Sequence, residues 1–196
     1  MLGPHALEFL YTITNFGDAN LIAPPVCGAI AALWVDGDRR NARALALAFA
    51  VCLAATVLSK ILFMFIYRGG PLRSPSGHTA LAAFVYGALA LLAWKRESLG
   101  GLRYVVIALC AAIVLGVAVS RFKIGGHSRT ETAFGLAYGV AAVAVLARRF
   151  AWRPQARSGV ALSAIAGVTV TLAAYVVLSS GYFDEDAISA FTRWLR

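Results

Sequence analysis

Two segments of the chain, far apart in the sequence, combine histidine, serine, glycine and basic residues in patterns that suit the chemistry of a phosphate group. The first ends in Pro75-Ser76-Gly77-His78, and the second runs from Ser120 through His127 to Glu131. Basic side chains heavily outnumber the single carboxylate across both segments, which favours an anion as the ligand. The basic residues in and around the two segments are Lys60, Arg68, Arg73, Arg121, Lys123 and Arg129.

His127, His78 and Glu131 are the candidate catalytic residues. His127 and Glu131 are four residues apart, so they share one face of a helix if that helix has begun by Gly126. The carboxylate could then hold one ring nitrogen of His127 as N–H and leave the other as a nucleophile. His78 comes from the other segment and could protonate a leaving group as a general acid. The alternative for His127 and Glu131 is a simple His–Glu pair on one helix.

Ser76 and Gly77 open an apolar run, and the backbone N–H groups and positive dipole of a helix start favour phosphate. Gly125 and Gly126 allow the backbone to approach a ligand closely just before His127. The segments contain no acidic pair to hold Mg²⁺, so lysine and arginine must neutralise the phosphoryl charge. We therefore predict metal-independent chemistry without a cofactor. The alternative for Arg73, Lys123 and Arg129 is that they anchor helix ends or contact lipid headgroups.

Six apolar runs must position these residues. The chain has 196 residues, of which 60% are hydrophobic and only 14% charged, whereas a soluble domain averages about a quarter charged. Each run approaches the roughly 17 to 25 residues that span a bilayer. We predict an all-α, six-transmembrane helical bundle that forms a single domain over residues 1–196. The predicted spans are 19–35, 44–67, 77–94, 102–119, 130–147 and 159–180.

The basic residues predict the orientation of this bundle. Loops after the first, third and fifth runs carry ten basic residues against three acidic ones, a net charge of +7 against +2 for the other side. By the positive-inside rule the first side is cytoplasmic. Both histidine segments then face outward, in what we expect to be a bacterial cytoplasmic membrane. We also predict short interfacial helices at the two ends of the chain, over residues 4–16 and 182–196. The three cysteines lie in apolar runs without metal-site spacing, so we expect buried thiols.

At these residues the sequence resembles the type-2 phosphatidic acid phosphatase family, integral-membrane enzymes related in active site to vanadium haloperoxidases. Pro75-Ser76-Gly77-His78 matches one motif, and Ser120-Arg121, five residues and then His127 match another. The resemblance implies that His127 forms a phosphohistidine, that Glu131 orients it, and that His78 protonates the leaving alkoxide. It also implies a phosphate-binding set of Lys60, Arg68, Ser76, Gly77 and Arg121.

The sequence departs from the family pattern in two places. Seven residues separate Lys60 from Arg68 instead of six, and Gly69-Gly70-Pro71 follows instead of proline directly. Arg73 is therefore an alternative to Arg68 for the arginine of the first motif. Glu131 stands where the family usually has aspartate, and its longer side chain can still reach the imidazole.

The resemblance implies a membrane lipid phosphatase that acts on a lipid phosphate or diphosphate through a phosphohistidine at the outer face. Membrane lipids are the expected partners, and nucleic acid is not, because the positive charge is divided among short loops. Three alternatives remain open: a lipid phosphotransferase that uses the same site, a lipid-phosphate binder or translocator without turnover, and a haloperoxidase-like enzyme with vanadate on His127.

Overall fold

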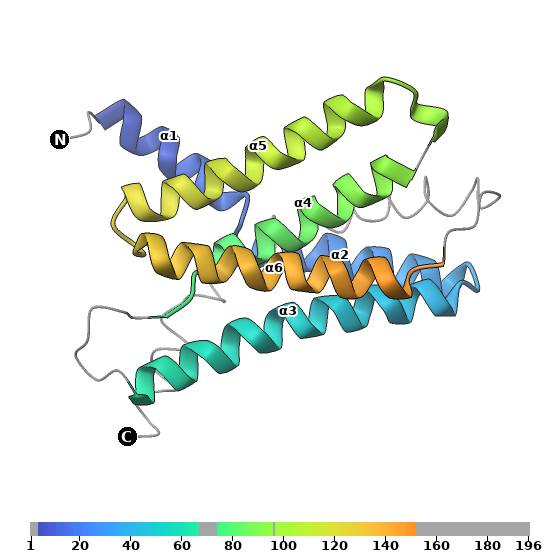
Figure 1. The fold of residues 1–196 in the computed structure, drawn as a ribbon, viewed down its shortest axis with the longest axis horizontal. Helices are drawn as coiled ribbons and strands as arrows, with labels where there is room; N and C mark the ends of the chain where they lie inside the picture. Colours follow the sequence, from blue (N-terminus) through green and yellow to red (C-terminus); the bar gives the residue numbers. More distant parts are fainter. Residues whose placement is uncertain (1–3, 67–73, 96, 152–196) are drawn as a thin grey trace.

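The structure, a computed structural model, describes residues 4–66, 74–95 and 97–151, and all regular structure within these ranges is helical. The elements follow one another as a series of helices (Figure 1). They are α1 (Pro4–Asn15), α2 (Ala19–Val35), α3 (Arg39–Ile66), α4 (Gly77–Lys95), the 3-10 helix η1 (Glu97–Leu99), α5 (Leu102–Lys123) and α6 (Arg129–Arg149).

Five helical stretches of the described residues are long and apolar enough to cross a membrane, with α1 and α2 counted together as the first. The first five predicted runs are therefore confirmed as helices. The boundaries differ where helices continue into charged flanks: α3 begins at Arg39 and α5 ends at Lys123. An apolar pattern stops at the first charge, whereas long basic side chains at a helix end can extend toward water. The sixth predicted run, 159–180, and the predicted C-terminal helix lie outside the described residues.

Helix α6 lies between α3 and α4, and α5 covers the other side of α4 (Figure 1). Helix α2 packs beside α3, and α1 crosses α5 near its C-terminal end. Helices α2 to α6 run in alternating directions (Figure 1), so the bundle has two chemically different ends. The starts of α2, α4 and α6 and the ends of α3 and α5 share one of them. The histidine segments therefore come together at a single end of the bundle.

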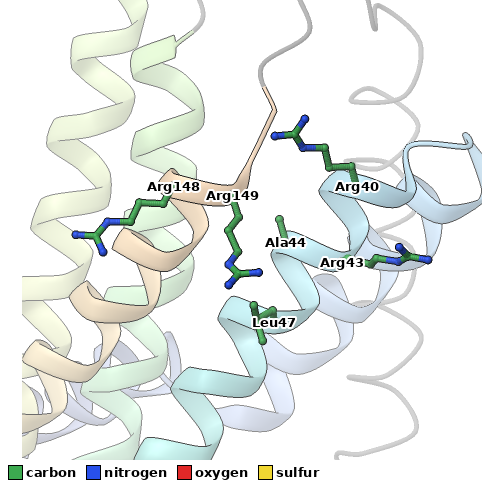
Figure 2. A pocket seen from close by; sticks show the side chains of 6 residues that line it. All are labelled: Arg40, Arg43, Ala44, Leu47, Arg148 and Arg149. Carbon is green, nitrogen blue, oxygen red and sulfur yellow. The ribbon is translucent and has the colours of Figure 1, made fainter.

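The opposite end is strongly basic. A cavity of about 630 Å³ there is lined by Arg40, Arg43, Ala44, Leu47, Arg148 and Arg149 (Figure 2). The guanidinium groups do not converge: Arg149 extends toward α3, whereas Arg148 and Arg43 point away in opposite directions. Both Arg39 and Arg43 lie over the ring of Trp34, at 5.7 and 5.8 Å from its centroid. These contacts are typical of cationic and aromatic side chains at a membrane surface.

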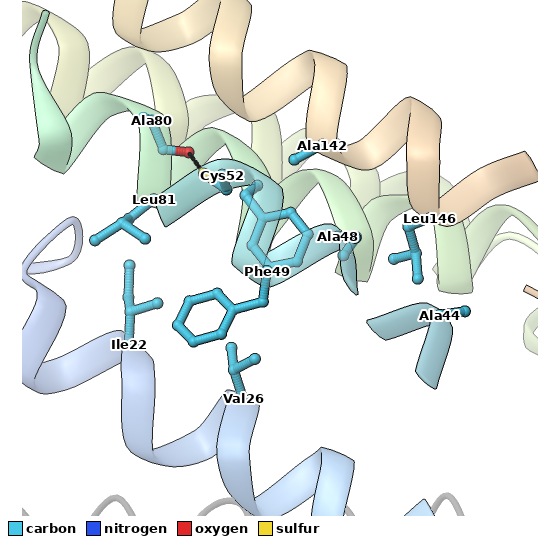
Figure 3. Close-up of a cluster of buried hydrophobic side chains, with 12 residues drawn as sticks. Ile22, Val26, Ala44, Ala48, Phe49, Cys52, Ala80, Leu81, Ala142 and Leu146 are labelled. Carbon is cyan, nitrogen blue, oxygen red and sulfur yellow. Dashed lines mark hydrogen bonds between the residues drawn. The ribbon is translucent and has the colours of Figure 1, made fainter. Parts of the chain in front are cut away.

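A small apolar core holds α2, α3, α4 and α6 together (Figure 3). Phe49 of α3 stacks on Phe84 of α4 with ring centroids 5.9 Å apart. Cys52 lies beside them, and its thiol approaches the carbonyl of Ala80 at 3.6 Å. The prediction of buried thiols is correct for Cys52 and Cys110 but wrong for Cys27, which is exposed. Cys27 directly follows Val26, which faces the core. Successive residues of a helix lie about 100° apart around its axis, so the Cys27 side chain points away from the core.

Two glycines allow α6 to approach α4 closely beside the histidine end. A Cβ atom on Gly139 would lie 2.4 Å from the carbonyl oxygen of Ala80, and one on Gly135 would lie 2.3 Å from that of Ser76. Glycines four residues apart form such close helix contacts in membranes. Any side chain at either position would force the two backbones apart. Gly135 and Gly139 thus fix the position of the Ser76 segment relative to α6.

Candidate active site

Glu131 joins the two histidine segments. One oxygen of its buried carboxylate, Oε2, lies 3.1 Å from Nδ1 of His127. The other oxygen accepts a hydrogen bond from the backbone N–H of Ser74 at 3.3 Å. The Glu131 carbonyl accepts the N–H of Ser76 at 3.0 Å. A single residue at the start of α6 therefore holds both His127 and the segment that leads into α4.

The contact between His127 and Glu131 arises differently from the sequence prediction. Helix α6 begins at Arg129, with Ser128 as its N-cap, one residue before the predicted span of 130–147. The condition for a shared helix face, a helix that has begun by Gly126, is therefore not met. Instead, Ser128 and Glu131 form a capping box, in which the Glu131 carboxylate accepts the N–H of Ser128 at 2.9 Å. That carboxylate turns back beyond the helix start and reaches His127 there. Serine followed three residues later by glutamate is a recognised helix-start pattern, and it explains how glutamate fits this position.

The turn between α5 and α6 fixes the backbone of His127. Gly125 adopts a φ of +78°, a conformation that favours glycine, and the N–H of His127 then donates to the carbonyl of Arg121 at 3.1 Å. A Cβ atom on Gly126 would lie 3.3 Å from Nη2 of Arg121. The guanidinium of Arg121, which is almost fully buried, thus lies against the turn that carries His127. The structure brings these two predicted site residues together.

Ser76 has a local role that the sequence analysis did not assign. It is fully buried, and its Oγ accepts hydrogen bonds from the hydroxyl of Thr79 at 3.0 Å and from the Thr79 backbone N–H at 3.4 Å. These bonds cap the first turn of α4, and a capping serine keeps its own hydroxyl proton to donate. Gly77 is the first residue of α4. Ser76 and Gly77 therefore place the positive end of α4 beside Glu131.

Part of α3 faces the start of α4. Cys52 approaches Ala80, and Thr56 lies one turn further along, 3.3 Å from the position of a Cβ on Gly77. Lys60 follows four residues after Thr56, about one further turn along α3. Arg68 and Arg73 lie outside the described residues.

Two other basic residues of the second segment lie on the surface of the turn. Lys123 and Arg129 are both exposed, and their charged groups lie over the ring of Phe122, at 5.9 and 5.6 Å from its centroid. Each contact is a cation–π interaction. The arrangement agrees with the alternative, stated above, in which these residues anchor a helix end.

Asp18 is a residue of this end that the sequence analysis missed. Its Oδ2 lies 3.5 Å from Nε2 of His78. Asp18 is the N-cap of α2 and accepts the N–H of Asn20 at 2.7 Å. An aspartate before an apolar run signals a helix start, but nothing in the sequence indicates its neighbour 60 residues later. Within the described ranges, no group of three or more His, Cys, Asp or Glu side chains is placed to hold a metal ion.

We expect Glu131→Gln to lower turnover by roughly tenfold to a thousandfold, because glutamine cannot hold His127 with a negative charge. Folding should persist, since glutamine also completes a capping box. Phosphate release and the unfolding temperature of the purified variant would test this, with Glu97→Gln in the distant exposed η1 as the matched control. An undiminished rate in Glu131→Gln would remove Glu131 from the orienting role.

Comparison with known protein families finds a match for the part of the chain that holds most of this site. A family model described as the PAP2 superfamily matches residues 65–155. The matched range contains His78, His127, Glu131 and Arg121, whereas Lys60 and Asp18 lie before it. No curated protein and no solved structure matches the chain.

Proposed function

Because residues 65–155 place the chain in the PAP2 superfamily, we propose that it is a membrane lipid phosphatase with His127 as its nucleophile. Membership in the superfamily supports a phosphoric ester hydrolase, and the apolar helices support an integral membrane protein. We further propose that the substrate is a lipid, that the reaction passes through a phosphohistidine, and that the site faces outward.

The observation that carries the proposal is the position of Glu131. It holds Nδ1 of His127 and, through its carboxylate and its carbonyl, the backbone of Ser74 and Ser76. A nucleophile must be oriented by a fixed neighbour and must face a site that stabilises the developing charge. Here the same residue that orients the imidazole also fixes the positive end of α4.

The proposed reaction has two steps. In the first, Nε2 of His127 attacks phosphorus, the bond from phosphorus to the lipid oxygen breaks, and His78 gives a proton to that oxygen. In the second, His78 accepts a proton from water, the water oxygen bonds to phosphorus, and the P–N bond to His127 breaks. Inorganic phosphate leaves, and both histidines return to their starting protonation states. His78 thus acts first as general acid and then as general base.

Positive charge near the site would stabilise the phosphoryl oxygens. Arg121 is buried against the turn of His127, and Lys60 of α3 is the second proposed cation. Arginine suits bidentate contact with phosphoryl oxygens, and the first turn of α4 adds backbone N–H groups. Of the two candidates for the first-motif arginine, Arg68 and Arg73, either would add a further cation. These groups would replace a metal ion, so activity should survive EDTA.

A lipid is the proposed substrate because large apolar side chains cover the outside of the helices. Leu58 and Leu62 of α3 and Leu109 and Leu115 of α5 are each more than half exposed. Such a surface suits a bilayer, where a lipid tail can lie against the bundle while its phosphate reaches the polar end. In the proposed arrangement, a phosphate on a lipid headgroup reaches the site laterally from the bilayer.

The proposed outer location follows from the distribution of charge. The end of the bundle opposite His127 carries the basic residues that the positive-inside rule assigns to the cytoplasm: Arg39, Arg40, Arg43, Lys95, Arg103, Arg148 and Arg149. In a Cys27→Ser background, Thr130→Cys should react in intact cells with a membrane-impermeant maleimide, whereas Arg40→Cys should react only after lysis. The reverse pattern would invert the orientation.

Phosphate release by the purified protein in nanodiscs is the direct test of the function. A panel of lipid monophosphates and diphosphates should reveal at least one substrate, with activity that survives EDTA and is inhibited by vanadate. Transfer of the phosphate to a second lipid alcohol, without release, would favour the phosphotransferase. Saturable binding of lipid phosphates without any bond cleavage would favour a binder or translocator and would contradict the proposal.

A further inference from the structure

The carboxylate of Asp18 bridges the start of α2 and the imidazole of His78. One oxygen, Oδ1, accepts the N–H of Asn20 at 2.7 Å, and the other, Oδ2, lies 3.5 Å from Nε2 of His78. The side chains are 34% and 15% exposed, respectively, so water screens this pair less than it would on an open surface. The carboxylate is therefore fixed at one oxygen and directed at the imidazole with the other.

The turn that carries Asp18 is itself packed against α4 and α5. A Cβ atom on Gly17 would lie 2.5 Å from the carbonyl oxygen of His78 and 2.9 Å from the side chain of Val117. The backbone N–H groups of Gly17 and Asp18 donate to the carbonyls of Thr14 and Asn15. The turn thus touches the backbone of His78 as well as its side chain. This double contact places Asp18 relative to His78 more firmly than a single surface ion pair would.

We propose that Asp18 is the positioning residue of His78, an inference that rests on the proposed function. Asp18 lies outside residues 65–155, the range that the family model matches. It holds Nε2 of the His78 ring, which leaves Nδ1 as the atom that delivers the proton. The site then contains two carboxylate–imidazole pairs that use different ring nitrogens. Asp18 holds Nε2 of His78, whereas Glu131 holds Nδ1 of His127 and directs Nε2 toward phosphorus.

The chemical consequence concerns the leaving group. When the P–O bond breaks, the proton on Nδ1 of His78 moves to the departing oxygen, and the imidazole becomes neutral while its Nε2–H stays bonded to Asp18. An alkoxide needs this proton, because its conjugate alcohol is a weak acid. A 4-nitrophenolate leaves without it. Loss of a residue that positions only the acid should therefore slow the cleavage of alkyl esters much more than that of aryl esters.

Two substitutions separate this role from the capping of α2. Serine is as good an N-cap as aspartate but is too short to reach His78, so Asp18→Ser should remove only the contact. Asparagine keeps the cap and the size, so Asp18→Asn removes only the charge. Asp36→Asn, an exposed acidic residue at the opposite end of α2, is the matched control. The unfolding temperatures of all three variants should stay close to that of the wild type.

The experiment compares kcat/KM for an alkyl lipid phosphate with kcat/KM for 4-nitrophenyl phosphate, because this ratio reports the steps through cleavage of the ester bond. Asp18→Ser should lower the value for the alkyl ester about tenfold to a hundredfold and that for the aryl ester less than about threefold. Equal losses on both esters, or no loss, would overturn the role of Asp18 while leaving the phosphatase intact. A wild-type protein that cleaves neither ester would overturn the proposed function, and the inference with it.

A spectroscopic readout tests the contact without turnover. The chain has only three histidines, so ¹H–¹⁵N spectra of histidine-labelled protein in detergent can be assigned with His78→Gln. The wild type should show a strongly downfield Nε2–H signal from His78, protected from exchange, and Asp18→Ser should lose it. Persistence of that signal in Asp18→Ser would show that another group holds the imidazole and would overturn the proposal.

Discussion

Replacing His127 with asparagine is expected to abolish phosphate release, with a loss of about five to six orders of magnitude in kcat, as for other nucleophiles that act within a unit. The expectation follows from the proposed covalent intermediate, in which Nε2 of His127 takes the phosphoryl group. Asparagine can still hydrogen-bond to Glu131, so the capping box and the turn after α5 should persist. Phosphate release in nanodiscs measures the rate, and the unfolding temperature confirms that the variant folds.

The exposed His5 of α1 provides the matched control, because it lies outside the bundle with a fully exposed side chain. His5→Asn should retain wild-type turnover. Wild-type protein quenched in alkaline detergent after reaction with a radiolabelled substrate should carry an acid-labile, alkali-stable phosphoryl group that His127→Asn lacks. Near-normal turnover in His127→Asn would contradict the mechanism, whatever the behaviour of the other site residues.

Replacing His78 with alanine is expected to slow the cleavage of an alkyl lipid phosphate by about two to four orders of magnitude, the usual contribution of a general acid. The first step requires a proton for the lipid oxygen, and the second requires a base for water. With 4-nitrophenyl phosphate, His78→Ala should still form the phosphoenzyme but should hydrolyse it slowly. The variant should therefore accumulate labelled protein that the wild type turns over.

A rapid-quench time course distinguishes this behaviour from simple loss of the site. A burst of 4-nitrophenolate close to one equivalent, followed by slow release of phosphate, is the expected result for His78→Ala. Thr12→Ala, a substitution on the exposed face of α1, should behave as the wild type. Full activity of His78→Ala on the alkyl ester would exclude His78 as the acid.

The positions of the helices could be predicted from the sequence because membrane-spanning helices leave a strong apolar pattern. The ends could not be placed from that pattern, since Arg39 and Lys123 continue helices beyond their apolar stretches. The predicted span of 130–147 begins one residue after the observed start of α6, Arg129, but the four-residue spacing of His127 and Glu131 wrongly suggested that the two could lie on one helix. Ser128 and Glu131 carried the correct signal, a capping box that places the helix start two residues after His127.

The composition of the candidate site could be predicted only as far as motifs describe it. His78, His127 and Glu131 stand in patterns that suggest phosphate chemistry, and Glu131 does link the two segments. Asp18 could not be found in this way, because its contact with His78 depends on how the α1–α2 turn packs between α4 and α5. The close approach of α6 to Ser76 also depends on packing, since Gly135 is one of 18 glycines, and only the helix arrangement reveals its role.

If both imidazoles serve one phosphorus atom, a structure with bound vanadate will show both of them on the same ion. Vanadate mimics the five-coordinate phosphorus of phosphoryl transfer. We expect a bond from vanadium to Nε2 of His127 and a hydrogen bond from Nδ1 of His78 to a vanadate oxygen, with Arg121 on the remaining oxygens. Vanadate bound elsewhere, or with the two histidine rings too far apart to contact the same ion, would contradict this expectation.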